Sequence, residues 1–199
     1  MMKIETLKPG KKPVGWSAAR KHLSTLDNAA LIALVKEMYD AAAWNRDFIH
    51  ARCRTSTGGG EVLERYRKKI IKQFFSSSLS GVGPLKLGEA RKAIRDYRKA
   101  TGSVPGTAEL LMTYVENGVE FTKQYGDIDA RFYDSVESVL KELSILLRGD
   151  ARELYPQFSD RLARVEELSD CVGWGFHDYI SDVVGRLDDE LGSPKTEGV

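Results

Sequence analysis

The stretch ARFYDSVESVLKELSILLRG, residues 130–149, has the clearest secondary-structure signal in the chain. Its apolar residues recur every three or four positions, which places them on one side of an α-helix. These residues are Phe132, Val136, Val139, Leu140, Leu143, Leu146 and Leu147. Because Gly149 interrupts the run, we predict a helix from about Ala130 to Leu147.

Helical periodicity of this kind extends over most of the chain and predicts about eight helices. The expected helices cover residues 16–23, 27–53, 61–75, 87–100, 105–126, 130–147, 151–171 and 176–191. Thr55–Gly60 is expected to be a break, because three consecutive glycines lose too much backbone entropy inside a helix. No stretch alternates with a period of two. We therefore expect an all-α fold of antiparallel hairpins, either a helical bundle or a short curved helical stack.

Composition and length favour one helical domain. A chain of 199 residues, 42% apolar and 30% charged, is typical of a soluble globular protein. We expect a flexible basic arm at 1–14, a single domain at 15–192 with a candidate sub-boundary in the Ser- and Gly-rich stretch 76–84, and a frayed tail at 193–199. Cys53 and Cys171 are the two cysteines, and neither a secretion signal nor a long apolar run accompanies them. These features predict reduced thiols and a cytoplasmic location without a membrane span.

The charge is divided unevenly along the chain. Residues 1–100 contain 21 Lys and Arg against 9 Asp and Glu, a net charge of +12, whereas residues 101–199 contain 9 against 20, a net charge of −11. Such a division offers a cationic surface to phosphates or acidic partners, and an anionic surface that could pair with it. The sequence leaves open whether the two halves neutralise each other internally or face outward.

Two basic stripes are the strongest candidate binding residues. In each of the helices expected at 61–75 and 87–100, four cations recur at helical spacing, opposite the apolar side. They are Arg65, Lys68, Lys69 and Lys72 on the first, and Arg91, Arg95, Arg98 and Lys99 on the second. Side by side, the stripes would form one patch for nucleic acid, although no DNA- or RNA-binding motif accompanies them. The alternative is two ordinary solvated helix faces.

Metal and nucleophile chemistry have little support in the sequence. Asp127, Asp129 and Asp134 are weak candidates for a cation, but their spacing does not fit a calcium loop, and one of the first two is expected to cap the following helix. A zinc site from His50, Cys53, Cys171 and His177 lacks the spacing of known zinc modules. Neither a phosphate loop nor a nucleophile motif is present. We therefore expect no metal site and no cofactor.

The string GWGFHD, residues 173–178, is the most unusual local feature. Its glycines separate two expected helices, and its aromatic residues are expected to enter the core. The alternative is a small-molecule pocket in which His177 is a polar contact. The pocket residues would be Trp174, Phe176, His177 and Asp178.

Several segments resemble a bacterial all-helical family catalogued as a domain of unknown function. These segments are YVENGVEFT at 114–122, YGDID at 125–129, FY at 132–133, SVES at 135–138 and GWGFHD, together with the early Leu-rich helices and YRKKI at 66–70. The resemblance covers roughly residues 20–190 and departs at Thr55–Gly60 and Ser76–Gly83. It implies a helical fold and a cytoplasmic bacterial setting, but no activity and no catalytic residues.

These observations favour a non-catalytic interaction or adaptor module, which binds a protein partner or self-associates by setting basic against acidic halves. Nucleic-acid binding through the basic stripes is the second hypothesis. A metal- or small-molecule-binding enzyme around GWGFHD is the weakest, and we lean against enzymatic activity.

Overall fold

The fold is all-α, as the sequence predicted. The computed structural model describes residues 15–52, 58–75, 77–78, 81–82, 85–170, 172–173 and 175–192. Within these residues lie nine α-helices: α1 (Trp16–Leu23), α2 (Asn28–Ala41), α3 (Ala43–Arg52), α4 (Gly58–Phe74), α5 (Leu87–Thr101), α6 (Val104–Tyr125), α7 (Ala130–Arg148), α8 (Tyr155–Ser169) and α9 (Phe176–Leu191). The predicted arm at 1–14 and tail at 193–199 lie outside the described residues.

The chain divides into two units between Arg46 and Asp47, so that α3 begins in the first unit and ends in the second. The sequence had predicted one domain over 15–192, with a candidate sub-boundary at 76–84. That stretch falls between α4 and α5, which pack directly against each other, with the rings of Tyr66 and Tyr97 5.5 Å apart. The shared core of the two helices keeps them within one unit.

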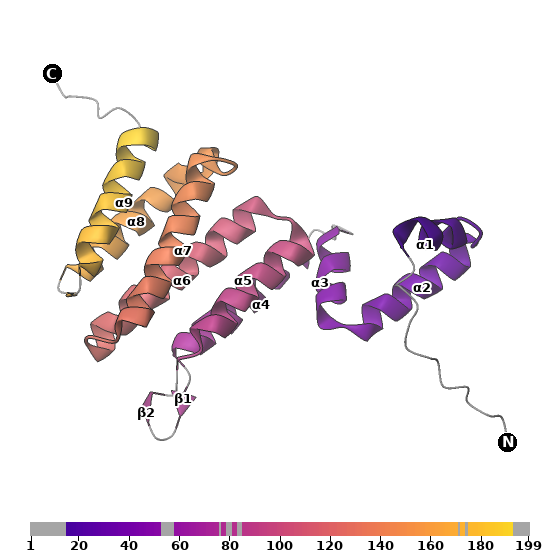
Figure 1. Ribbon diagram of the computed structural model, residues 1–199, viewed down its shortest axis with the longest axis horizontal. Helices are drawn as coiled ribbons and strands as arrows, with labels where there is room; N and C mark the ends of the chain where they lie inside the picture. Colours follow the sequence, from indigo (N-terminus) through magenta and orange to yellow (C-terminus); the bar gives the residue numbers. More distant parts are fainter. Residues whose placement is uncertain are drawn as a thin grey trace. The chain divides into compact units, whose positions relative to one another are not determined.

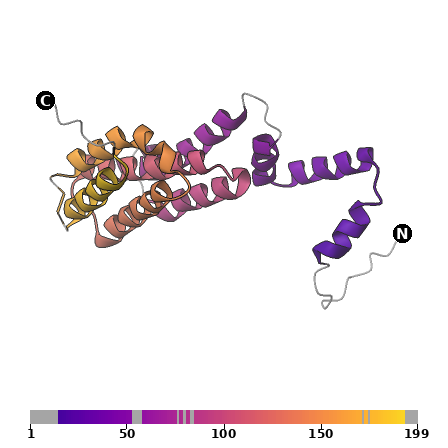
Figure 2. The same ribbon diagram turned by 90° about the horizontal axis from the view of Figure 1, so that it is seen from above.

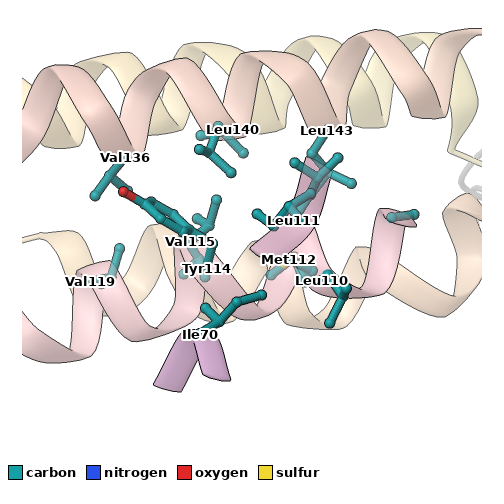
Figure 3. Close-up of a cluster of buried hydrophobic side chains, with 14 of the residues drawn as sticks. Ile70, Leu110, Leu111, Met112, Tyr114, Val115, Val119, Val136, Leu140 and Leu143 are labelled. Atoms are coloured by element: carbon teal, nitrogen blue, oxygen red, sulfur yellow. The ribbon is translucent and has the colours of Figure 1, made fainter. Parts of the chain in front are cut away.

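The second unit is built around α6, which packs against α4, α5, α7 and α8, while α9 covers α7 and α8 (Figures 1 and 2). Of its 22 residues, 13 are buried, which makes α6 the central helix. Figure 3 shows Val136, Leu140 and Leu143 of α7 pointing toward the α6 residues Tyr114 and Leu111. All five side chains are fully buried.

Local sequence signals set the ends of the central helices. Gly102 ends α5 in the left-handed conformation, with φ of 62°, where glycine meets no steric penalty. Ser103 then caps α6, its hydroxyl accepting from the Gly106 N–H at 3.1 Å, and Pro105 lies in the first turn as predicted. Asp129 caps α7 by accepting from the Phe132 N–H at 2.9 Å. These residues confirm the predicted helix boundaries.

The predicted helix at 27–53 is two helices, because the chain is extended at Ala42, with φ of −152° and ψ of 144°. The side-chain amide of Asn45 donates to the Met38 carbonyl at 2.6 Å and so takes one of the carbonyls left free where α2 ends. Alanine is a strong helix former, so Ala41–Ala43 carry no signal for this break.

Two further helix starts and one loop differ from the predictions. The first turn of α4 includes Gly58–Gly60, whereas the sequence placed them in a loop; the buried Val62 and Tyr66 in the next turns hold this glycine-rich start of the helix in place. The helix expected at 151–171 begins as a 3-10 turn, Arg152–Leu154, before α8. The loop between α4 and α5 contains a two-residue antiparallel ladder of β1 (Ser77–Ser78) and β2 (Gly81–Val82), in which Ser77 pairs with Val82.

We predict that Gly118→Ala destabilises the protein. A Cβ on Gly118 of α6 would lie 2.6 Å from Val136 Cγ2 of α7, so the two helices would have to separate. Overpacking of this kind costs about 1–3 kcal/mol, more than the ~1 kcal/mol that alanine contributes to helix propensity. The free energy of unfolding from urea titration measures the change.

Gly185→Ala is the matched control. Gly185 lies in the interior of α9, and a Cβ there meets nothing within 4 Å. We therefore expect a gain of up to about 1 kcal/mol. If both substitutions changed stability in the same direction, close packing of α6 on α7 would not be the determining factor.

Candidate interaction surfaces

The predicted stripe on α4 is only partly available for binding. Arg65 donates to the buried carboxylate of Asp47 at 2.5 Å, and the Tyr66 hydroxyl donates to the same carboxylate at 2.7 Å. Burial, followed by this hydrogen bond, raises the pKa of Tyr66. Lys69 lies over the Tyr66 ring, 4.3 Å from its centroid. Lys68 and Lys72 are exposed, and neither forms an ion pair with another described residue.

The stripe on α5 is similarly divided. Arg91 donates to the Ser138 hydroxyl of α7 at 3.2 Å, and Arg98 forms an ion pair with Glu142, also of α7, at 2.5 Å. Both arginines are therefore directed toward α7. Arg95 and Lys99 are exposed, and within the described part of the chain they have no acidic partner.

The structure thus separates the eight predicted cations into two groups. Arg65, Arg91 and Arg98 hold elements of the second unit together, because each bonds to a residue of another helix. The remaining five lie on two neighbouring helices, α4 and α5. We refer to these five as the basic face: Lys68, Lys69, Lys72, Arg95 and Lys99.

A chain of alternating charges joins three helices, and sequence reasoning missed it. Arg161 of α8 forms a bidentate pair with Glu116 of α6, at 2.8 and 2.7 Å, and also donates to Glu109 at 2.7 Å. Arg67 of α4 donates to the other oxygen of Glu109 at 2.8 Å. The hydrogen bonds to Glu116 are the main reason that the pKa of Arg161 is raised, against the lowering effect of desolvation.

The sequence signal for this charge chain is slight. Glu109 and Glu116 are seven residues apart, so both lie on the same side of an otherwise largely buried helix. Nothing in the sequence identifies Arg161, 45 residues beyond Glu116, as their partner. A cavity of about 230 Å³ adjoins the pair and is lined by Glu116, Asn117, Glu120, Arg161, Arg164, Val165 and Leu168.

The basic half of the sequence (residues 1–100) and the acidic half (residues 101–199) therefore neutralise each other in part within the second unit. Arg67 pairs with Glu109 and Arg98 pairs with Glu142, and both pairs join the basic half of the sequence to its acidic half. The Arg98–Glu142 pair also borders a cavity of about 490 Å³, where Val104, Ile145 and Leu146 supply apolar walls. The five residues of the basic face are exposed.

The described residues of GWGFHD contact other protein side chains or solvent. Phe176 is fully buried and packs on Tyr133, with ring centroids 4.9 Å apart. His177 Nδ1 is 2.9 Å from the Ser169 hydroxyl, and its Nε2 is 3.8 Å from Asp170. Asp178 is exposed in the first turn of α9. The cavities beside Arg98 and Arg161 are lined by other residues, and Trp174 lies outside the described residues.

The three aspartates considered for a cation have separate roles. Asp129 caps α7, Asp127 accepts from the Tyr133 hydroxyl at 3.3 Å, and Asp134 is exposed. Within the described residues, no group of three His, Cys, Asp or Glu side chains could hold a metal ion. Cys53 and Cys171 lie outside the described residues. Among the described helices, none combines the length and apolar character needed to cross a lipid bilayer.

In the described part of the first unit, residues 15–46, apolar side chains do not form a core. Neither α1 nor α2 contains a buried residue. On α2 the exposed fraction is 70% for Ile32, 47% for Val35 and 52% for Met38, and we call these three residues the apolar strip. Trp16 and Trp44 are also exposed, at 72% and 55%. Apolar side chains that cluster on one face without cover are typical of interaction surfaces.

We predict that Arg161→Leu lowers the free energy of unfolding by about 1.5–3 kcal/mol, because Glu116 loses both of its guanidinium hydrogen bonds and Glu109 loses one. Chemical denaturation measures the loss. Arg164→Leu is the control, since Arg164 borders the same cavity but is exposed, and its effect should stay within about 0.5 kcal/mol. Equal losses would show that the charge chain does not stabilise the three helices.

Compared with known proteins, the chain matches no protein-family model, no curated protein and no solved structure. The resemblance to a helical family of unknown function therefore stays a prediction.

Proposed function

We propose that this protein is a non-catalytic helical interaction module, and that its N-terminal helices bind a protein partner or a second copy of the chain. The observation that carries the proposal is the absence of any buried residue in α1 and α2, despite the apolar strip of Ile32, Val35 and Met38. Helices of this length are marginal in water without packing. A bound partner would supply packing for α1 and α2, neither of which has a buried residue.

The chemistry of the exposed residues also supports a protein partner. Met and Trp are enriched in the centres of protein interfaces, where large apolar side chains leave water. Burying a side chain such as Ile32 or Met38 is worth about 1.5–3 kcal/mol before the costs of association are subtracted. The second unit would then be a separately folded body, held together by its own core, that the N-terminal helices attach to the partner.

Affinity capture from the source organism, with and without nuclease, tests the proposal. We expect a stoichiometric protein partner, or the chain itself, to survive nuclease and to be lost from Ile32→Asp, because burying an unpaired carboxylate is costly. Ala33→Asp is the matched control, since Ala33 is exposed on the same helix outside the apolar strip. If Ile32→Asp retained the same bound protein as the native chain, the apolar strip would not be the binding surface.

Nucleic-acid binding is the second candidate function, and the basic face favours it. Lys68 and Lys72 on α4, with Arg95 and Lys99 on α5, are exposed, and no described acidic side chain pairs with them. Cations free of internal partners can replace the counterions that condense on a phosphate backbone. The helix positions of these residues do not supply a base-reading motif, so we expect binding to be largely independent of sequence.

Replacing Lys68, Lys72, Arg95 and Lys99 together with alanine tests this function. We expect weaker binding to duplex DNA or RNA and a shallower dependence of log affinity on log salt, by about 0.9 for each phosphate of B-DNA that the variant no longer neutralises. Arg131→Ala combined with Arg164→Ala removes exposed cations from the acidic half and should leave the slope unchanged. An unchanged slope in the fourfold variant would exclude the basic face as the site.

A further inference from the structure

The second unit carries opposite charges on helices that lie on different sides of it. Helices α4 and α5 together contain ten Lys and Arg against four Asp and Glu, a net charge of +6. In α9, one arginine stands against five Asp and Glu, a net charge of −4. The first two helices pack on α6, whereas α9 packs on α7 and α8 (Figure 1). One copy of the second unit therefore presents a cationic side and an anionic side.

The negative charge of α9 includes a straight row of carboxylates on the solvent side of the helix. Asp182 and Asp189 follow Asp178 by four and eleven positions, so at 100° per residue the three fall within about 40° of one another. All three are exposed, opposite the buried Ile180 and Leu187. Asp182 pairs with Arg186 of the same helix, and within the described part of the chain Asp178 and Asp189 have no basic partner. We call Asp178, Asp182 and Asp189 the acidic stripe.

The basic face has dimensions that suit a single acidic helix. Because α4 and α5 both pack on α6, their exposed sides point away from it. Lys68 and Lys72 lie one turn apart on α4, and Arg95 and Lys99 lie one turn apart on α5. Neighbouring helix axes are about 8–10 Å apart, and the acidic stripe is roughly 16 Å long at 1.5 Å per residue. The cations of both helices can therefore reach carboxylates on one helix laid along them.

We propose that the acidic stripe of one copy binds the basic face of a second copy, head to tail. The interface is heterologous, since the two copies contribute different surfaces. The two surfaces lie on different sides of the same unit, so one copy does not pair them internally. Two copies that share one contact leave one basic face and one acidic stripe free, and further copies can add. The inference concerns the second unit alone and goes beyond the proposed function of the N-terminal helices.

Charge favours a second copy over a polyanion as the occupant of the basic face. Residues 47–199 contain 22 Lys and Arg against 25 Asp and Glu, a net charge of −3. Nucleic acid is attracted by the basic face alone and repelled by the rest of the unit, whereas a second copy offers the complementary surface itself. Exposed ion pairs are individually weak and are screened by salt. We therefore expect reversible association that is strongest at low ionic strength.

Sedimentation velocity of the full-length chain, before and after nuclease treatment, tests the association. In about 0.01 M salt, where the Debye length is about 30 Å, we expect oligomers that grow beyond the dimer with concentration and survive nuclease. At about 1 M salt, where it is about 3 Å, we expect monomer. The proposal is overturned by a chain that stays monomeric in low salt, by oligomers that persist at 1 M, or by oligomers that nuclease removes.

Neutralising the acidic stripe tests the surface. The triple variant Asp178→Asn, Asp182→Asn and Asp189→Asn should lose the low-salt oligomers. The matched control is the triple variant Asp134→Asn, Asp150→Asn and Asp160→Asn, which removes three exposed carboxylates outside α9 and changes the net charge equally. We expect the control to associate like the native chain, with circular dichroism confirming unchanged helicity in both variants. Native-like association of the stripe variant would overturn the proposal.

Mixing two defective variants tests the head-to-tail arrangement. The stripe variant keeps its basic face, and the fourfold alanine variant of Lys68, Lys72, Arg95 and Lys99 keeps its acidic stripe. Each should be monomeric alone, since each lacks one of the two surfaces. Together they should form a one-to-one dimer and nothing larger, because the only intact surfaces are used up in a single contact. Failure of the mixture to form this dimer would overturn the arrangement.

This pairing and the proposed function can fail separately. Ile32→Asp lies in the first unit and should leave the low-salt oligomers unchanged. If Ile32→Asp dissociated them, the apolar strip would be the contact, and head-to-tail pairing would be overturned. If the oligomers persisted and Ile32→Asp released no bound protein, the pairing would stand and the proposed function would fail.

Discussion

The second unit depends on the burial of α6. A helix that is apolar on nearly every side has to be covered on nearly every side, and four helices pack against α6. Close approach is possible where a side chain is missing, as at Gly118 opposite Val136. The two glutamates on the same helix, Glu109 and Glu116, are the exception to its apolar character, and α8 meets them with Arg161. The apolar surface of α6 is buried by packing against other helices, and the ion pairs of Glu109 and Glu116 with Arg161 favour α8 on the side where the glutamates lie.

The opposite charges of the two halves have more than one role. Inside the second unit, Arg67 and Arg98 of the basic half each form an ion pair with a glutamate of the acidic half. Exposed pairs such as Arg98–Glu142 contribute little to stability, about 0–1 kcal/mol, but they orient neighbouring helices. The cations of the basic face remain outside this internal pairing. The net charge of +1 therefore conceals both internal neutralisation and a cationic surface.

The sequence predicted those features that depend on local chemistry. Gly102, Pro105 and Asp129 each act within a few residues of themselves, so the boundaries of α5, α6 and α7 were readable. The break at Ala42 was not readable, because the alanines around it favour a helix, and the Asn45 side chain that bonds to the Met38 carbonyl there gives no recognisable signal in the sequence. The partners of Arg65, Arg98 and Arg161 lie 18 to 52 residues away in the chain, so a periodic stripe could not show which cations are already engaged. The sequence could not show that α2 has no buried residue, because the spacing of its leucines is the same as in a helix that packs in a core.

The unequal burial of α6 and α2 also sets how fast their backbone amides exchange with solvent deuterium. An amide in the middle of α6 is enclosed by helices on several sides, so its hydrogen is released chiefly when the whole second unit opens. No residue of α2 is fully buried, so local fraying is enough to expose an amide there. The same polypeptide therefore contains backbone hydrogens whose lifetimes differ by orders of magnitude, and those of α2 lengthen whenever something covers its apolar side.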